Sequence, residues 1–149
     1  MTKSSKSAAL TDLVLEIFRL NGLLIASGDA LVAGIGLTSA RWQVVGAVAL
    51  QQGRSPVAHI ANVMGLTRQS VQRIADELKK AGIVEFRHNP HHKRAKLVTL
   101  TAKGHALNDA AMHRQKPWAA ALAADIDRSE LQTTIAVLAQ LRSRLEEST

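Results

Sequence analysis

The stretch of sequence that decides the fold, residues 65–84, reads GLTRQSVQRIADELKKAGIV. Thr67 is a favourable helix N-cap residue, and Gly82 stands where a helix commonly ends in the left-handed conformation. Four apolar residues recur between them at helical spacing, namely Val71, Ile74, Ala75 and Leu78. At 100° per residue these side chains share about a third of the circumference. The stretch therefore predicts a helix over residues 67–81 with one buried face and one polar face.

A shorter helix is predicted immediately before it. Ser55-Pro56 resembles an N-cap followed by a proline in the first helical position, where proline is tolerated. Apolar residues at helical spacing continue from there to Gly65, and Met64-Gly65-Leu66 predicts a tight turn. Two helices joined by a short, glycine-containing turn form the helix-turn-helix pattern.

The periodicity changes from helical to alternating after Gly82. Residues 83–88 are rich in β-branched and aromatic side chains, and residues 94–100 predict a returning strand with Val98 and Leu100 on one face. The polar stretch Asn89-Pro90-His91-His92 predicts the turn between them. Two strands after a helix-turn-helix make a wing, so residues 37–101 are predicted to form a winged helix-turn-helix lobe.

Helices are predicted on both sides of the wing and the helix-turn-helix. Apolar periodicity predicts one helix over residues 8–33, and Ser39 is expected to cap a second one that ends near Gln52. Thr101 is expected to cap a helix that Pro117 bends or interrupts, and a last helix follows at residues 127–147. The predicted fold class is mainly α with a small β-wing, in a single domain spanning residues 1–149.

Positive charge is concentrated in the predicted lobe. The chain has a formal net charge of +7, and residues 57–104 carry nine basic and three acidic side chains. Such a block suggests a docking surface for a polyanion such as DNA. The chain has no cysteine, which excludes disulfides, thiolate metal sites and thiol-based redox sensing. With no apolar run of about 18 residues and no signal peptide, we expect no membrane span and a cytoplasmic location.

The polar face of the helix over residues 67–81 carries the expected base-reading chemistry. A helix-turn-helix presents the N-terminal residues of its second helix to base edges in the major groove. Arginine can donate two hydrogen bonds to guanine and glutamine can pair with adenine, whereas hydroxyl groups suit phosphates. The predicted DNA-binding residues of this helix are Thr67, Arg68, Gln69, Ser70, Gln72 and Arg73.

The wing supplies a second basic constellation, because residues 88–103 contain no acidic side chain. Lys93 and Arg94 at its turn are expected to enter the minor groove or to contact the phosphates that flank it. Three wing histidines raise the alternative of a metal site, namely His88, His91 and His92. No carboxylate or thiolate in the turn completes a ligand set, so we predict no metal site. We also predict no cofactor and, since no catalytic motif is present, no enzymatic activity.

In their order and spacing these pieces resemble the MarR-type winged-helix regulators over residues 37–107. The resemblance rests on Leu37-Thr38-Ser39-Ala40-Arg41-Trp42, Ile60-Ala61, Gly65-Leu66-Thr67, Val71-Gln72-Arg73, Gly82-Ile83-Val84, Asn89-Pro90-His91-His92-Lys93-Arg94-Ala95 and Val98-Thr99-Leu100-Thr101. The family's wing usually has acidic residues where Asn89 and His92 stand. The resemblance therefore transfers minor-groove contact to Arg94, but not the acidic brace on that arginine.

The resemblance implies a homodimeric, site-specific transcription regulator, most often a repressor, on a palindromic double-stranded DNA operator. It implies dimerisation helices at residues 8–36 and 102–147. The apolar surface of the helices at residues 8–33 and 127–147 independently exceeds what a small lobe can cover. It also implies release by a small aromatic or anionic effector, with Trp42 either lining the effector pocket or packing in the core. Without cysteine, the oxidation-sensing branch of the family is excluded.

Three alternatives stay open. The chain could be a metal-responsive regulator that uses its histidines, or an architectural protein that coats DNA non-specifically. It could also be a winged-helix module that binds only proteins. The mixed Gln, Ser and Thr chemistry of the reading face is more than a purely electrostatic binder needs. The positive charge of residues 57–104 argues against a module that binds only proteins.

Overall fold

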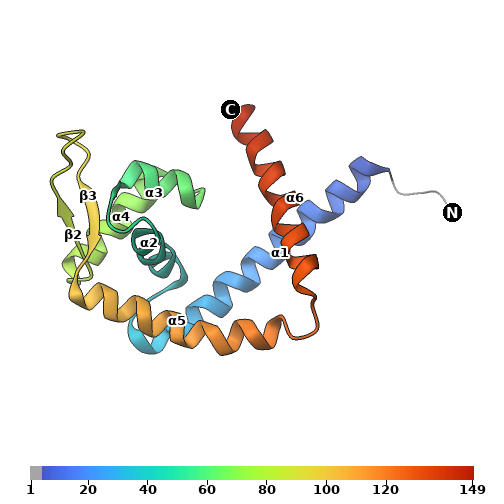
Figure 1. Ribbon diagram of the computed structural model, residues 1–149, viewed down its shortest axis with the longest axis horizontal. Helices are drawn as coiled ribbons and strands as arrows, with labels where there is room; N and C mark the ends of the chain where they lie inside the picture. Colours follow the sequence, from blue (N-terminus) through green and yellow to red (C-terminus); the bar gives the residue numbers. More distant parts are fainter. Residues whose placement is uncertain (1–4) are drawn as a thin grey trace. The chain divides into compact units, whose positions relative to one another are not determined.

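The computed structural model describes residues 5–149, and the chain divides into two compact units. The first unit ends at Arg114 and the second runs from Gln115 to Thr149. The elements are α1 (Lys6–Val32), the 3-10 helix η1 (Ala33–Ile35), α2 (Ser39–Leu50), β1 (Ser55–Pro56), α3 (Val57–Met64), α4 (Arg68–Lys80), β2 (Val84–Arg87), β3 (Leu97–Leu100), α5 (Ala102–Leu122) and α6 (Arg128–Glu147). The predicted fold class, mainly helical with a small β-sheet, is confirmed (Figure 1).

Helices α2, α3 and α4 of the first unit share one aliphatic core. The four apolar residues predicted for the buried face of α4, residues 71, 74, 75 and 78, are all at most 3% exposed. The core cluster that contains Val71, Ile74 and Leu78 also includes Val44, Val45, Val48, Ile60, Val84 and Val98. Because this face of α4 is held inside, its polar face is left for solvent and for a partner.

The sheet has three strands rather than the two predicted for the wing. Its order is β1-β3-β2, and both pairings are antiparallel. Ser55 and Pro56 pair with Val98 and Leu97, so the prediction that they begin a helix was wrong. Helix α3 begins only at Val57, after Pro56. Proline is tolerated in β1 because the strand lies at the edge of the sheet.

The start of α2 is tied to α1 by two short hydrogen bonds. Thr38 is the N-cap, and its side chain accepts a hydrogen bond from a first-turn amide at 3.2 Å, so the prediction of Ser39 as the cap was wrong by one residue. Ser39 is buried instead; its amide donates to the Asp29 carboxylate and its hydroxyl donates to the Ile25 carbonyl, both at 2.6 Å. A Cβ on Gly28 would overlap the Ser39 hydroxyl, so glycine allows this close approach.

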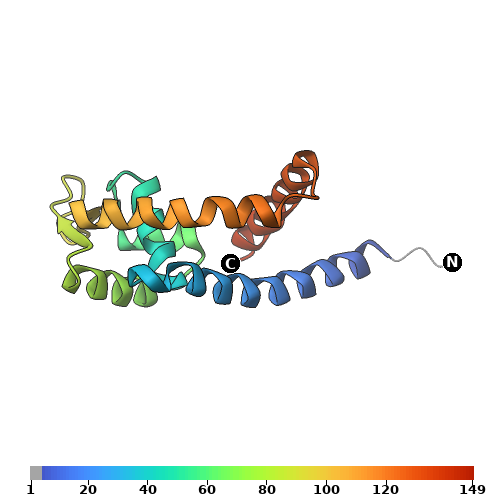
Figure 2. The same ribbon diagram turned by 90° about the horizontal axis from the view of Figure 1, so that it is seen from below.

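The outer helices lie close to their predicted bounds, and α5 is more regular than the sequence predicts. Helix α1 begins at Lys6, where the Ser5 hydroxyl accepts a hydrogen bond from the Ala8 amide at 3.1 Å. Helix α5 continues through Pro117 as one helix, so the predicted interruption was wrong (Figure 2). Proline removes one backbone donor but leaves the hydrogen bonds of the turns on either side.

The second unit contains the end of α5, a turn over residues 123–127 and helix α6. No residue of α6 is buried by the part of the chain that the structure describes, although large apolar side chains recur along it. Within residues 5–149, no single helix is long and apolar enough to cross a membrane. Among the described residues, one bent pair, α1 with η1 and then α2 at 80°, satisfies such a requirement on length and composition.

Candidate nucleic-acid interface

The first turn of α4 is built to present polar groups. Thr67 has extended backbone dihedrals and its hydroxyl accepts a hydrogen bond from the Ser70 amide at 3.1 Å, which confirms the predicted N-cap. Gly65 ends α3 in the left-handed conformation at φ 66°, and this residue turns the chain from α3 into α4. The six residues predicted to contact DNA from this helix are exposed, apart from the half-buried Ser70.

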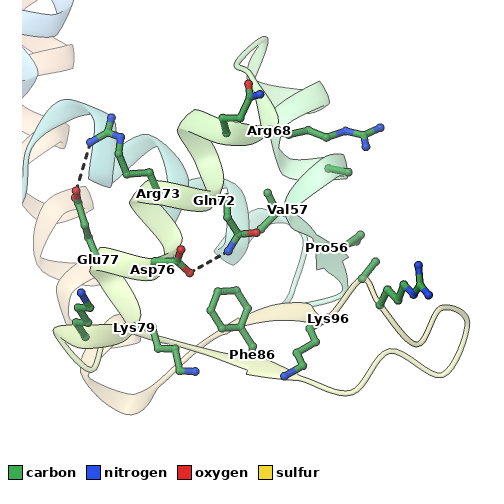
Figure 3. A pocket seen from close by; sticks show the side chains of 15 residues that line it. Pro56, Val57, Arg68, Gln72, Arg73, Asp76, Glu77, Lys79, Phe86 and Lys96 are labelled. Atoms are coloured by element: carbon green, nitrogen blue, oxygen red, sulfur yellow. Dashed lines mark hydrogen bonds and ion pairs between the residues drawn. The ribbon is translucent and has the colours of Figure 1, made fainter.

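A groove of about 1100 Å³ lies between α4, the β1–α3 junction and the wing (Figure 3). It brings together five of the residues predicted to contact DNA, namely Arg68, Gln69, Gln72, Arg73 and Arg94. Thr67, Ser70 and Lys93 are not among its lining residues. One concave, basic surface therefore combines side chains from the helix with Arg94 of the wing. Arg94 follows the last of these helix residues, Arg73, by 21 positions in the sequence.

The groove has further lining residues: the sequence did not single out Lys79, Lys80 and Phe86, whereas Lys96 belongs to the basic stretch of the wing. The additional cations are Lys79, Lys80 and Lys96, and Phe86 contributes an aromatic ring. The Lys79 ammonium lies 5.3 Å from the centre of the Phe86 ring, within cation–π distance. The two lysines at the end of α4 resemble ordinary helix C-terminal charges in sequence, so only the wing that folds back beside them gives them a place in the groove.

Two of the residues predicted to read bases are engaged by carboxylates of the same helix. The Gln72 amide donates to Asp76 at 2.9 Å, and the Arg73 guanidinium donates to Glu77 at 3.3 Å. Both pairs have the four-residue spacing that makes side chains neighbours on a helix (Figure 3). Glu77 also accepts a hydrogen bond from Arg41 of α2 at 3.2 Å.

The wing turn is braced by neutral side chains in place of the acidic ones. Asn89 is 9% exposed, donates to the Ala95 carbonyl at 2.9 Å and accepts from the His91 amide at 3.0 Å. The His92 Nδ1 accepts a hydrogen bond from the Ala95 amide at 3.2 Å. An asparagine both donates and accepts, so one side chain spans the turn that holds Arg94.

Replacing Asn89 with alanine is expected to lower the free energy of unfolding by about 1–2 kcal/mol, because two backbone groups of the turn lose their partner. Chemical denaturation followed by circular dichroism measures the change. His91→Ala is the matched control in the same turn. The His91 imidazole is exposed, and the hydrogen bond from the backbone amide of residue 91 to the Asn89 side chain survives the substitution. An equal loss of stability in both variants would contradict the bracing role of Asn89.

The wing histidines do not form a metal-binding cluster in the residues that the structure describes, 5–149. No three His, Asp or Glu side chains of this part of the chain lie close enough together to share an ion. His92 instead uses its Nδ1 within the turn. The metal-responsive alternative therefore gains no support from this geometry.

Trp42 is half-buried and packs against the core cluster of the first unit. This position agrees with the alternative of a core tryptophan. It does not test the prediction that the same side chain lines an effector pocket.

The sequence of the winged-helix lobe matches the model of the MarR family over residues 35–95. A relative from Mycobacterium tuberculosis, the uncharacterized protein Rv2011c, is 38% identical over 128 residues. The match covers 86% of this chain and 88% of that relative. The chain belongs to the MarR family.

Solved MarR-family structures share its fold. A mutant of MarR from E. coli, complexed with operator DNA, has a TM-score of 0.77 at 20% identity, covering 93% of this chain and 99% of its own. CouR from Rhodococcus jostii RHA1, bound to p-coumaroyl-CoA, has a TM-score of 0.79 at 20% identity, covering 95% of each chain. The predicted winged-helix fold is confirmed. Membership supports the predicted DNA-binding, regulatory role, and MarR-family regulators are not enzymes.

Proposed function

We propose that this MarR-family protein is a homodimeric repressor that binds a palindromic operator and is released from it by a small molecule. The observation that carries the proposal is the groove, which gathers the polar face of α4 and the wing arginine on one exposed basic surface. Double-stranded DNA is the partner that such a surface fits, and the predicted cytoplasmic location is part of this proposal. No cofactor and no catalytic step are required.

In this proposal α4 and the wing contact different parts of the DNA. Arg68, Gln69, Gln72 and Arg73 enter the major groove, where arginine and glutamine can discriminate bases. The hydroxyls of Thr67 and Ser70 and the first amides of α4 contact phosphates. Lys93 and Arg94 of the wing contact the minor groove or its phosphates without distinguishing bases strongly.

The proposal of a homodimer rests on apolar side chains that each unit leaves exposed. On α1 these are Leu10, Leu15, Phe18, Leu20, Leu23, Leu24 and Ile25. On α6 they are Leu131, Ile135, Val137, Leu138 and Leu145. Rows of exposed apolar residues along a helix indicate an interface. We infer that residues 8–36 and 102–147 supply it, so that a two-fold axis places two α4 helices in successive major grooves.

The proposed effector is a small aromatic or anionic molecule. CouR binds p-coumaroyl-CoA, which combines an aromatic acyl group with an anionic carrier. For this chain the proposal assigns Trp42 to the effector pocket, because its ring is half-buried on α2 rather than wholly enclosed.

A footprint on the DNA that adjoins the coding region of this protein tests the proposal. We expect one protected, palindromic site bound more tightly than random DNA. A uniform affinity for all sequences would instead indicate the architectural alternative. Adding a panel of aromatic acids and their thioesters to the complex of protein and operator then tests whether a small molecule releases the protein from DNA.

Replacing Arg73 with alanine is expected to weaken operator binding by about 5- to 150-fold, because an arginine–guanine pair is worth about 1–3 kcal/mol of discrimination. Replacing Arg94 with alanine is expected to weaken operator and random DNA by similar factors, since its contacts lie outside the base edges of the major groove. Fluorescence anisotropy with both DNAs measures the dissociation constants of the wild type and of the two variants. An unchanged operator affinity in the Arg73 variant would contradict the assigned reading face.

A further inference from the structure

Glu77 lies between two arginines that come from different helices. Its Oε2 accepts from Arg41 of α2 at 3.2 Å, and its Oε1 accepts from Arg73 of α4 at 3.3 Å. One carboxylate thus binds a scaffold residue and a predicted base-reading residue at the same time. Figure 3 shows the Arg73 side chain directed toward Glu77.

The two arginines differ in how easily their side chains can dissociate from Glu77. The side chain of Arg41 is 34% exposed and belongs to α2, whose core residues pack against α4. The side chain of Arg73 is 67% exposed and lines the groove. Exposed ion pairs are weak and are screened by salt, so the Arg73 contact is the easier one to exchange for a DNA contact.

We propose that Glu77 is a positioning residue for specificity, which retains Arg73 on the protein until a matching operator base replaces the carboxylate. The proposal rests on the proposed function of α4 in reading DNA. On random DNA, Arg73 finds only phosphates, and the charge of Glu77 opposes their approach. On the operator, a bidentate contact to guanine outcompetes the exposed ion pair.

Arg41 makes this exchange possible. When Arg73 dissociates from Glu77, the carboxylate keeps its ion pair with Arg41, so its negative charge stays compensated. Without Arg41, Arg73 is the one arginine of the two that remains beside Glu77, and the carboxylate holds its guanidinium more strongly. Arg41 therefore promotes operator binding without touching DNA.

The experiment measures dissociation constants for the operator and for random DNA of equal length at one fixed salt concentration. For Glu77→Gln we expect tighter binding of random DNA and a fall of about three- to fivefold in the operator-to-random affinity ratio, the scale of an exposed ion pair. For Arg41→Gln we expect weaker operator binding. In the double variant Arg41→Gln/Glu77→Gln, the effect of Arg41→Gln should disappear.

Glu85→Gln is the matched control. Glu85 of β2 accepts two hydrogen bonds from Arg87, at 2.9 and 2.6 Å, and it is not among the residues that line the groove. Its substitution removes one negative charge from the same lobe and frees an arginine that is not a predicted reader. We expect the affinity ratio of this variant to equal that of the wild type.

Equal affinity ratios in the Glu77→Gln variant and the wild type would overturn the proposal, as would an equal fall in the Glu85→Gln control. A loss from Arg41→Gln that persists in the double variant would show that Arg41 acts on its own and would also overturn it. Thermal unfolding of each variant identifies any loss that comes from misfolding; Arg41→Lys, which keeps a cation, then replaces Arg41→Gln and should retain operator binding. If the wild type itself does not prefer the operator, the proposed function fails together with this inference.

Discussion

Raising the salt concentration from about 50 to about 200 mM is expected to weaken operator binding by on the order of 10³-fold. Six basic side chains line the groove, namely Arg68, Arg73, Lys79, Lys80, Arg94 and Lys96. All six are exposed, and the four that the proposed function does not assign to base edges, Lys79, Lys80, Arg94 and Lys96, can approach phosphates. A homodimer presents two such grooves, which reaches the six to ten phosphate contacts at which counterion release gives an effect of about this size.

Anisotropy titrations at several salt concentrations give the slope of log affinity against log salt. Replacing Arg94 and Lys96 of the wing with alanine should reduce that slope by about 1 for each phosphate contact removed. Arg19→Gln is the control, because this exposed arginine lies on α1 and pairs with Glu16 at 2.9 Å. A wild-type slope no steeper than that of the wing variant would contradict a wing that binds phosphates.

The sequence predicted α4 well because its information is local. The spacing of Val71, Ile74 and Leu78 reports which face is buried, and Thr67 marks where the helix begins. The choice of exposed residues on the opposite face follows from that geometry alone. Their roles in binding DNA stay predictions.

Other features could not be predicted because they depend on contacts between distant residues. The two-residue strand β1 has no periodicity of its own and exists only through pairing with Leu97 and Val98. In sequence, Ser39 is as favourable an N-cap residue as Thr38. In the fold, however, the Ser39 amide donates a hydrogen bond to the Asp29 carboxylate of α1. In each case tertiary packing overrides a local preference.

The wing shows that a change of residue type does not always remove an interaction. From the missing acidic residues, the sequence predicts a turn without an acidic brace. Asn89 nevertheless bridges the turn, because its amide supplies the donor that a carboxylate lacks. Similarly, the pairs of Gln72 with Asp76 and of Arg73 with Glu77 follow from helical spacing, whereas the contact of Glu77 with Arg41 requires the fold.

Replacing Gly104 with alanine is expected to lower the free energy of unfolding by about 1–2 kcal/mol. A Cβ at this position would overlap the Ile83 carbonyl oxygen, which is backbone and cannot rotate away, and would lie 3.2 Å from the Leu100 Cβ. Overpacking of this kind costs about 1–3 kcal/mol or more, while the better helix propensity of alanine returns at most about 1 kcal/mol.

The position of Gly104 explains why this loss should reach the DNA-binding surface. The Ile83 carbonyl accepts hydrogen bonds from the Thr101 amide and hydroxyl, both at 3.1 Å, so displacing it separates α5 from the start of β2. β2 is paired along its length with β3 and forms the wing with it, so operator affinity should fall together with stability. Gly46→Ala is the control, since a Cβ there lies within 4 Å of no atom outside its own stretch of helix. The free energy of unfolding of this variant should rise by about 0.5–1 kcal/mol. Urea unfolding of both variants measures the difference, and a Gly104 variant as stable as the wild type would show that α5 can shift at its start without disturbing the sheet.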